Sequence, residues 1–368
     1  MHQKNSNIFI GIMSGTSLDG IDMAACRFWE ENKTWRFEII DASTYEYSAA
    51  EAAILKNAVD LSGANLISLH HQYGTLIGKK AKLFCDTYQL KPDYIASHGH
   101  TIFHQPNNNF NFFNTQHANL GLNGFTFQLG HGANIAAAAG IKTICDFRTL
   151  DVAYGGQGAP LVPIGDELLF SEYNYCLNLG GISNISFNQN GKRTAFDIGI
   201  CNMALNELAQ QASLKFDRDG LLARSGNIEK SLLKQLIDAA SKNHINHQSL
   251  GYEWYTAHLL PIINAFKCAI ENKLCTLCEF IAMQIKLVTS SKSKILVTGG
   301  GAKNIFLMEC IRQHTQCQII YPTEQIIEFK EALIFAFLGL LRVNQQANSL
   351  QLVTGASKDA IGGCVYLP

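Results

Sequence analysis

The sequence has little proline, little charge and no long apolar run. Only 7 of its 368 residues are proline, and charged side chains make up 16% with a formal net charge of −1. So small a net charge gives no overall field that would attract nucleic acid or an anionic membrane. The apolar run from Ala332 to Leu341 is too short to cross a bilayer. We therefore expect neither nucleic acid nor a membrane as a partner.

Several sequence signatures are also missing. No G-x-x-x-x-G-K-[ST] segment occurs, which excludes a P-loop protein. The first residues, MHQKNSNIFIGIMSG, lack the apolar core and cleavage site of a signal peptide, so we expect a soluble, cytoplasmic protein. The 11 cysteines are odd in number and scattered, which favours reduced thiols over a disulfide framework.

What the sequence does contain is an α/β pattern that occurs twice. With 47% hydrophobic residues the chain is long and apolar enough to bury a sizeable core. Each half opens with strand, glycine turn and further strands, and continues with helical spacing and more strands. The predicted opening strands span residues 8–13, 21–28 and 35–40 in the first half, and 175–179, 184–187 and 194–196 in the second. The pattern indicates a duplicated α/β architecture.

The first glycine turn has the composition of a phosphate site. Ser14-Gly15-Thr16-Ser17 places small residues and hydroxyls between two strands, where backbone N–H groups can converge on an anion. Asp19 follows closely and could hold a phosphate-bound Mg²⁺ through water. An ordinary hairpin turn explains the same composition, because Gly and Ser are common in turns.

Two further glycine turns lie in the second half. Gly180-Gly181 follows a predicted strand, and Gly299-Gly300-Gly301 lies between a strand and a predicted helix. Glycine permits close backbone approach, and a helix N-terminus favours negative charge. Each turn is weak evidence alone, but together with the first they are typical of a protein that binds a nucleotide.

Polar side chains cluster in two segments of the first half. Ser97 to His104 contains three histidines whose spacing matches no common zinc signature, so hydrogen bonding to a polar ligand is favoured over metal binding. Cys145 to Leu161 offers Arg148, two carboxylates and an amide before a glycine loop, which suits a carboxylated or hydroxylated substrate. An Asp/Arg pair that fastens a loop is the competing interpretation.

Asp197 is the candidate general base. It is predicted to end a hydrophobic strand just before a helix, where partial desolvation would raise the basicity of its carboxylate. A helix N-cap role is the alternative, and the sequence alone does not separate the two.

Read together, these segments resemble the anhydro-N-acetylmuramic acid kinase family from Gly11 to about Tyr366. The residues that carry the resemblance are GIMSGTSLDGID, SHGHTIFHQP, CDFRTLDVAYGGQGAPLVP, LNLGGISNISF, FDIG, FDRDG and VTGGGAKN. The resemblance implies an actin/hexokinase-like ATPase fold of two lobes, with the active site in the cleft between them. We expect an N-terminal lobe over 1–150 and a C-terminal lobe over 151–368, whose last segment could pack back on the first lobe.

The resemblance also implies an activity. The family uses ATP to convert 1,6-anhydro-N-acetylmuramic acid plus water into N-acetylmuramic acid 6-phosphate, in peptidoglycan recycling. ATP and Mg²⁺ are the expected cofactors, the sugar is the small-molecule partner, and a homodimer is expected. Asp197 falls on the catalytic aspartate, which would deprotonate the attacking water.

The remaining site residues are carried over by motif. Those expected to bind the nucleotide are Ser14, Gly15, Thr16, Ser17, Leu18, Asp19, Gly20, Ile21, Asp22, Gly180, Gly181, Gly299, Gly300 and Gly301, with Asp19 also assigned to Mg²⁺. Those expected to hold the sugar and its lactyl carboxylate are His98, Thr101, Arg148, Asp151 and Gln157. Among the sugar residues, Arg148 is the expected electrostatic partner of the carboxylate.

The chain departs from the family pattern at two places. Many members read D-x-G-P-G-N where this chain reads Asp197 to Asn202 without the Pro-Gly, and S-H-G-Q-T where His100 replaces the amide. Two other functions stay open: a kinase of the same fold for another hexose or amino sugar, and a non-catalytic nucleotide or muropeptide sensor, for which the altered turn after Asp197 is the only support in the sequence.

Overall fold

The computed structural model describes residues 7–15, 18–106, 124–241, 250 and 252–368. The chain forms two compact units, the first made of Met1–Leu169 with Phe329–Pro368 and the second of Phe170–Glu328. This division differs from the predicted boundary after residue 150. Helix α5 (Val162–Leu169) and most of helix α13 (Glu324–Val343) belong to the first unit. The chain returns to the first unit inside α13, at Phe329, whose backbone is not helical (φ −112°, ψ 15°).

The first unit is built on a six-stranded sheet. Its strand order is β13-β7-β4-β1-β2-β3. These strands are β1 (Ile8–Met13), β2 (Gly20–Glu31), β3 (Thr34–Glu46), β4 (Tyr94–Ser97), β7 (Lys142–Cys145) and β13 (Cys364–Tyr366). The pairs β1/β2 and β2/β3 are antiparallel, whereas β1/β4 and β4/β7 are parallel. A separate hairpin pairs β5 (His100–Gln105) with β6 (Phe125–Leu129).

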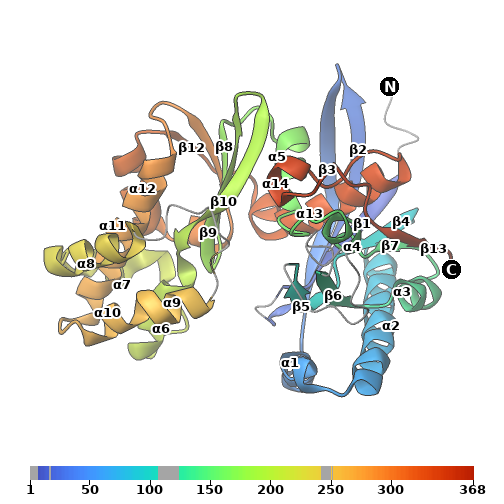
Figure 1. Ribbon diagram of the computed structural model, residues 1–368, viewed down its shortest axis with the longest axis horizontal. Helices are drawn as coiled ribbons and strands as arrows, with labels where there is room; N and C mark the ends of the chain where they lie inside the picture. The colour runs from blue at the N-terminus through green and yellow to red at the C-terminus, as the bar shows by residue number, and fades with distance from the viewer. Residues whose placement is uncertain (1–6, 16–17, 107–123, 242–249, 251) are drawn as a thin grey trace, which may run out of the picture. The chain divides into compact units, whose positions relative to one another are not determined.

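Helices cover both faces of this sheet because β1 is apolar on both sides. Ile10 and Ile12 belong to a core formed with α2 (Gly63–Tyr88) and α3 (Gly132–Ala139), which run side by side in Figure 1. On the opposite face α13 lies directly against β1, and a β-carbon at Gly11 would overlap the carbonyl oxygen of Ala332. Glycine is therefore required at this position. The remaining elements of the unit are α1 (Ala49–Lys56), η1 (Ala58–Asp60), α4 (Thr149–Ala153), α5 and α14 (Gln351–Thr354).

The second unit repeats the same topology. Its sheet has the order β10-β9-β8-β11-β12, with β8/β9 and β9/β10 antiparallel and β8/β11 and β11/β12 parallel. The strands are β8 (Tyr175–Leu179), β9 (Ile182–Gln189), β10 (Lys192–Ile200), β11 (Lys294–Thr298) and β12 (Gln318–Ile320). This order matches β3-β2-β1-β4-β7 of the first unit strand for strand. The predicted duplicated α/β architecture is confirmed.

The helices of the second unit enclose a core of its own. The long amphipathic helix α11 contributes Leu274, Leu277, Phe280 and Ile281 to that core. The helical elements are α6 (Asn202–Gln211), η3 (Arg218–Gly220), α7 (Leu221–Ser225), α8 (Lys230–Ser241), α9 (Tyr252–His258), α10 (Leu260–Ala265), α11 (Ile270–Val288), η4 (Gly300–Lys303) and α12 (Ile305–Thr315). No helix within the described ranges is long and apolar enough to span a membrane.

Candidate active site

The two glycine turns of the second unit meet at the ends of its parallel strands. Gly299 has a positive φ of 81°, and a β-carbon there would lie 2.6 Å from Asn178 Oδ1 and 2.8 Å from the Leu179 carbonyl oxygen. Only glycine fits so close an approach at this backbone angle. The Asn202 side chain donates to the Leu179 carbonyl oxygen over 2.8 Å and lies against Gly300. The turns predicted from separate parts of the sequence thus form one surface.

The first of these turns is attached to helix α6 through its carbonyl groups. The N–H groups of Cys201 and Asn202 donate to the carbonyl oxygens of Gly181 and Gly180 over 2.9 and 3.1 Å. This arrangement forms although the Pro-Gly of the family pattern is missing. Within the described part of the chain, the N–H groups of Gly180 and Gly181 donate to no acceptor. They are available to an anion such as a phosphate.

Asp197 lies within β10, three residues before its end, and this corrects the prediction that it ends the strand. The register of β10 against β9 shifts between Asp197 and Gly199, which indicates a β-bulge. Bulges change the direction of a side chain and are frequent next to active sites. The N-cap of α6 is Cys201, so the N-cap alternative for Asp197 is excluded.

The surroundings of Asp197 are partly apolar. Its Oδ2 accepts a hydrogen bond from the Leu250 N–H over 2.8 Å, and the residue is half-buried. It lines a cavity of about 410 Å³ together with Phe196, Trp254 and Phe280. The backbone thus orients a carboxylate at the wall of a cavity, which is the position that a general base needs.

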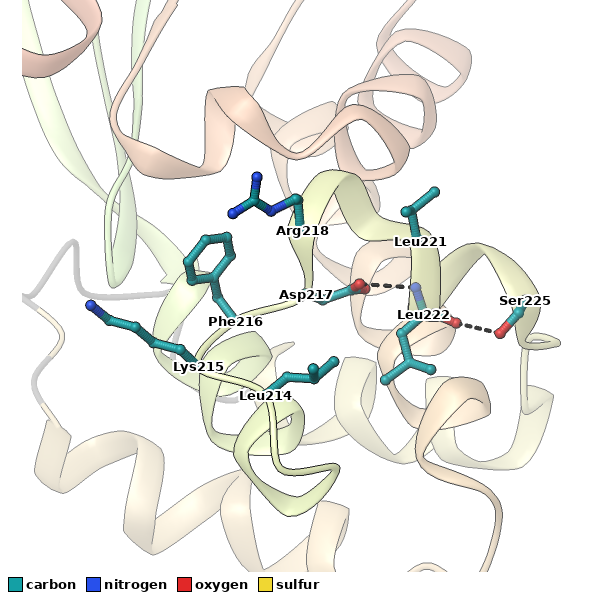
Figure 2. A pocket seen from close by; sticks show the side chains of 8 residues that line it. All are labelled: Leu214, Lys215, Phe216, Asp217, Arg218, Leu221, Leu222 and Ser225. Carbon is teal, nitrogen blue, oxygen red and sulfur yellow. Dashed lines mark hydrogen bonds between the residues drawn. The ribbon is translucent and has the colours of Figure 1, made fainter.

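A second pocket of the same unit is lined by residues between Leu214 and Ser225. It has a volume of about 530 Å³ and is shown in Figure 2; its lining includes Leu214, Lys215, Phe216, Arg218 and Leu221. The Arg218 guanidinium lies 6.0 Å from the centre of the Phe216 ring. Asp217 points away from them and accepts the N–H groups of Leu222 and Ala223, both over 2.9 Å.

This pocket connects to the glycine turn through Asn304. A β-carbon at Gly220 would overlap Asn304 Oδ1, so the Asp217–Gly220 turn lies directly against the start of α12. Phe216 and Leu221 are 46% and 62% exposed, so they offer apolar surface at the wall of this pocket. The residues Phe216 to Gly220 (FDRDG) are part of the family resemblance, but the sequence alone indicates no role for them.

In the first unit, the predicted phosphate segment starts with a buried side chain. Ser14 is 1% exposed, and its hydroxyl contacts Tyr47, Tyr73 and His100. Of the other residues assigned to the nucleotide, Ile21 is in the core and Asp22 accepts a hydrogen bond from Thr44 over 2.6 Å. Asp19 is exposed, Gly15 and Leu18 are half-buried and Gly20 is buried. Thr16 and Ser17 lie outside the described residues.

His98 and Arg148, assigned to the sugar, lie in direct contact. His98 Nδ1 donates to the Gly99 carbonyl oxygen over 2.8 Å, and its Nε2 accepts from Arg148 Nε and Nη2 over 3.0 and 2.9 Å. Burial, followed by the charge of Arg148, lowers the pKa of His98 well below its usual value. The imidazole is therefore neutral near pH 7 and orients the guanidinium.

Arg148 keeps donors for a ligand. Its Nη1 donates to the Gly158 carbonyl oxygen over 2.6 Å, so three of its five N–H groups are used within the described residues. Burial lowers its pKa to about 10, which leaves it charged at neutral pH. A charged guanidinium with two remaining N–H groups suits a carboxylate.

Asp151 is placed differently from a ligand-binding residue. It is fully buried, and its carboxylate accepts hydrogen bonds from the Gly158 N–H and from the hydroxyls of Ser349 and Thr354, each over 2.7 Å. Asp151 fastens the glycine loop and the C-terminal segment to α4, through partners other than Arg148. Gln157 is exposed and its N–H donates to the Thr354 carbonyl oxygen, whereas Thr101 is half-buried beside Gln128.

Glu331 is an exposed carboxylate close enough to Arg148 to interact with it electrostatically, which the sequence did not predict. It lies on α13, and its carboxylate interacts with Arg148, Asp22 and Lys330. No local motif marks it, because it lies far along the chain from Arg148 and the sheet brings the two together. Among the described residues, no group of three or more His, Cys, Asp or Glu side chains is placed to hold a metal.

Comparisons with known proteins identify the family to which the chain belongs. The family model described as anhydro-N-acetylmuramic acid kinase matches residues 7–368. The anhydro-N-acetylmuramic acid kinase of Vibrio cholerae is 32% identical over 98% of this chain and 98% of its own, and that of Aliivibrio fischeri is 33% identical over 97% and 98%. The solved activator of the 2-hydroxyisocaproyl-CoA dehydratase from Clostridium difficile, with bound ADPNP, is similar at 10% identity and a TM-score of 0.42, over 92% of this chain and 97% of that one. The chain belongs to the anhydro-N-acetylmuramic acid kinase family.

Proposed function

We propose that this protein converts 1,6-anhydro-N-acetylmuramic acid, water and ATP into N-acetylmuramic acid 6-phosphate and ADP. Membership of the kinase family over nearly the whole chain is the observation that carries the proposal. The positions of Asp197, the two glycine turns and Arg148 support it, because each has the chemistry that one part of this reaction needs.

The nucleotide is assigned to backbone groups that suit its phosphates and to a pocket that suits its base. The unused N–H groups of Gly180 and Gly181 would bind phosphate oxygens, as would the start of the Gly299–Gly301 turn. The pocket at Phe216 and Arg218 would take the adenine ring, since a flat base can stack on an aromatic ring and a guanidinium. The Ser14–Asp22 segment would contact the β- and γ-phosphates.

Mg²⁺ is assigned to Asp19 through water. Mg²⁺ keeps several of its waters and uses one or two carboxylates together with substrate phosphates, so it needs no cluster of protein ligands. The exposed carboxylate of Asp19 beside the phosphate segment fits that requirement. When bound, the ion would neutralise charge on the phosphates during transfer.

The sugar is assigned to Arg148, His98, Thr101 and Gln157. The two remaining N–H groups of Arg148 match a lactyl carboxylate, and His98 holds the guanidinium in place. Asp151 acts on the site through the loop that it fastens.

Asp197 would supply the base for both bond changes. It takes a proton from water, the water oxygen forms a bond to C1, and the C1–O6 bond breaks with its electron pair left on O6. O6 then accepts the γ-phosphoryl group and ADP departs. One base thereby serves hydrolysis of the anhydro ring and phosphorylation of O6.

The cellular setting follows from the same proposal. An anhydro amino sugar released from peptidoglycan would meet ATP in the cytoplasm, so we place the protein there, in cell-wall recycling. A homodimer is part of the proposal on family resemblance. Nucleic acid is not an expected partner, since the net charge is −1.

Asp197→Asn tests the assigned base. The amide is nearly the same size and can still accept the Leu250 N–H, so the variant is expected to fold and bind nucleotide but to lose turnover by at least about a hundredfold. Sugar phosphate release, thermal melting and nucleotide affinity are measured together. An Asp197→Asn protein with wild-type turnover would exclude the role.

A further inference from the structure

Four polar side chains from different elements meet at the Ser14 hydroxyl. Ser14 Oγ lies 2.7 Å from Tyr47 Oη, accepts from Tyr73 Oη over 2.8 Å and lies 3.3 Å from His100 Nδ1. The two phenol oxygens are 2.5 Å apart. Ser14 follows β1, Tyr47 follows β3, Tyr73 lies on α2 and His100 starts β5. We call these four residues the Ser14 cluster.

The cluster is enclosed by the protein. Ser14, Tyr73 and His100 are buried, and Tyr47 is half-buried. Each hydroxyl has one proton to donate and finds an acceptor inside the cluster. Burying so many polar groups is costly unless all of them are paired, and a fully paired network fixes the positions of its members.

The cluster carries no charge at neutral pH. Burial raises the pKa of Tyr73 well above 10 and also raises that of Tyr47, whereas it lowers the pKa of His100. Its members therefore have no charge with which to attract a phosphate. Their contribution to a site must come through the backbone that they hold.

Tyr47 contacts the predicted phosphate segment at two points, Ser14 and Asp19. Its phenol contacts Ser14 at the start, and its N–H donates to the Asp19 carbonyl oxygen over 3.4 Å. His100 adds a connection to the turn between β4 and β5, which carries His98. The N–H of His98 also donates to the Ile12 carbonyl oxygen over 2.9 Å, just before Ser14.

We propose that Tyr47 and Tyr73 are positioning residues that hold the backbone at Ser14 and Gly15 in the geometry needed by the β- and γ-phosphates of ATP. The inference rests on the proposed function, which assigns this segment to those phosphates. Neither tyrosine touches the nucleotide. Both act through the Ser14 hydroxyl, so removing one phenol oxygen weakens the binding of a triphosphate and spares a nucleotide that lacks the outer phosphates.

The test compares two nucleotides on the full-length protein. Dissociation constants are measured by calorimetry with Mg²⁺ for the non-hydrolysable ATP analogue AMPPNP and for AMP. Tyr73→Phe and Tyr47→Phe each remove one hydroxyl. Tyr255→Phe is the matched control, because Tyr255 is fully buried in the second unit and its phenol donates to Glu207 over 2.8 Å.

Loss of one hydrogen bond from the cluster is expected to raise the dissociation constant for AMPPNP about three- to tenfold. AMP affinity should stay within about twofold of wild type, because the lost contact lies at the outer phosphates. Tyr255→Phe should lower the melting temperature by a similar amount and change neither affinity. This pattern separates positioning from general destabilisation.

Three results would overturn the inference. Unchanged AMPPNP affinity in both Tyr→Phe variants would show that the cluster does not position the segment. An equal loss of affinity for AMPPNP and for AMP would show that the substitution disturbs the whole protein rather than the phosphate segment. A wild-type protein that binds no AMPPNP would refute the proposed function as well, whereas a wild type that binds AMPPNP but phosphorylates no sugar refutes the function alone.

Discussion

Substitution of Asp151 distinguishes a residue that fastens a loop from one that binds a ligand. Asp151→Ala deprives the Gly158 N–H and the hydroxyls of Ser349 and Thr354 of their shared acceptor inside a fully buried site. Hydrogen bonds to a charged group contribute about 1.5–3 kcal/mol each, and the two hydroxyls can turn to other acceptors. We expect a loss of about 3–5 kcal/mol in the free energy of unfolding.

The amide variant should be milder. Asp151→Asn can keep the Gly158 N–H on its oxygen and turn its NH₂ toward the two hydroxyls, so we expect a loss of about 1–2 kcal/mol. Asp93→Ala is the control, because Asp93 is exposed and accepts one bond, from the Ile8 N–H over 2.9 Å. It should cost less than about 1 kcal/mol.

The assay combines urea unfolding, thermal melting and steady-state kinetics. In a unit of this size 1 kcal/mol corresponds to about 2–4 °C in Tm. The KM for the anhydro sugar should rise in Asp151→Ala, because Gly158 also holds Arg148, and nucleotide affinity should not change. An Asp151→Ala protein as stable as wild type but unable to bind sugar would refute the reasoning.

Three further predictions follow from the site. Arg148→Lys should raise the sugar KM at least about tenfold with little change in ATP affinity, since an ammonium cannot replace a planar fork; an unchanged KM would exclude Arg148 as the carboxylate partner. Phe216→Ala should weaken AMPPNP about tenfold, measured by calorimetry against Phe125→Ala, which is similarly exposed in the other unit; equal effects would exclude the pocket as the adenine site. Burial and two neighbouring histidines lower the pKa of His70 to about 4. Because the unfolded chain then binds a proton at a higher pH than the folded chain does, the free energy of unfolding should fall as pH drops from about 6.5 toward 4. Urea midpoints of wild type and His70→Asn, measured across this pH range, test the prediction, and an equal dependence on pH in the two proteins would contradict it.

The strand pattern and the glycine turns could be predicted because their signals are local. An apolar run followed by Gly180-Gly181 or Gly299-Gly300-Gly301 marks a strand and the turn after it in the sequence itself. Their meeting at one sheet edge also follows, since neighbouring parallel strands end at the same edge. The bulge at Asp197 could not be predicted, because it depends on the register of β10 against β9.

Other features depend on contacts between distant residues. Asp151 is bonded to Ser349 and Thr354, about 200 residues further along the chain, so its local sequence suggested a ligand residue. Helix α13 packs against β1 at Gly11, through Ala332, which lies more than 300 residues further along the chain. The same packing helps to place Phe329–Pro368 in the first unit, although the predicted boundary left only the last segment of the chain to pack there.

The most direct test of the central claim is mass spectrometry of the sugar product formed in ¹⁸O-labelled water. Purified protein is incubated with ATP, Mg²⁺ and 1,6-anhydro-N-acetylmuramic acid, and unlabelled N-acetylmuramic acid 6-phosphate beside it measures exchange at the anomeric carbon. We predict a 6-phosphate that carries one solvent oxygen at C1, above the exchange control. A phosphorylated sugar without solvent oxygen, or no phosphorylated sugar from folded, nucleotide-binding protein, would contradict the coupled ring opening and phosphorylation.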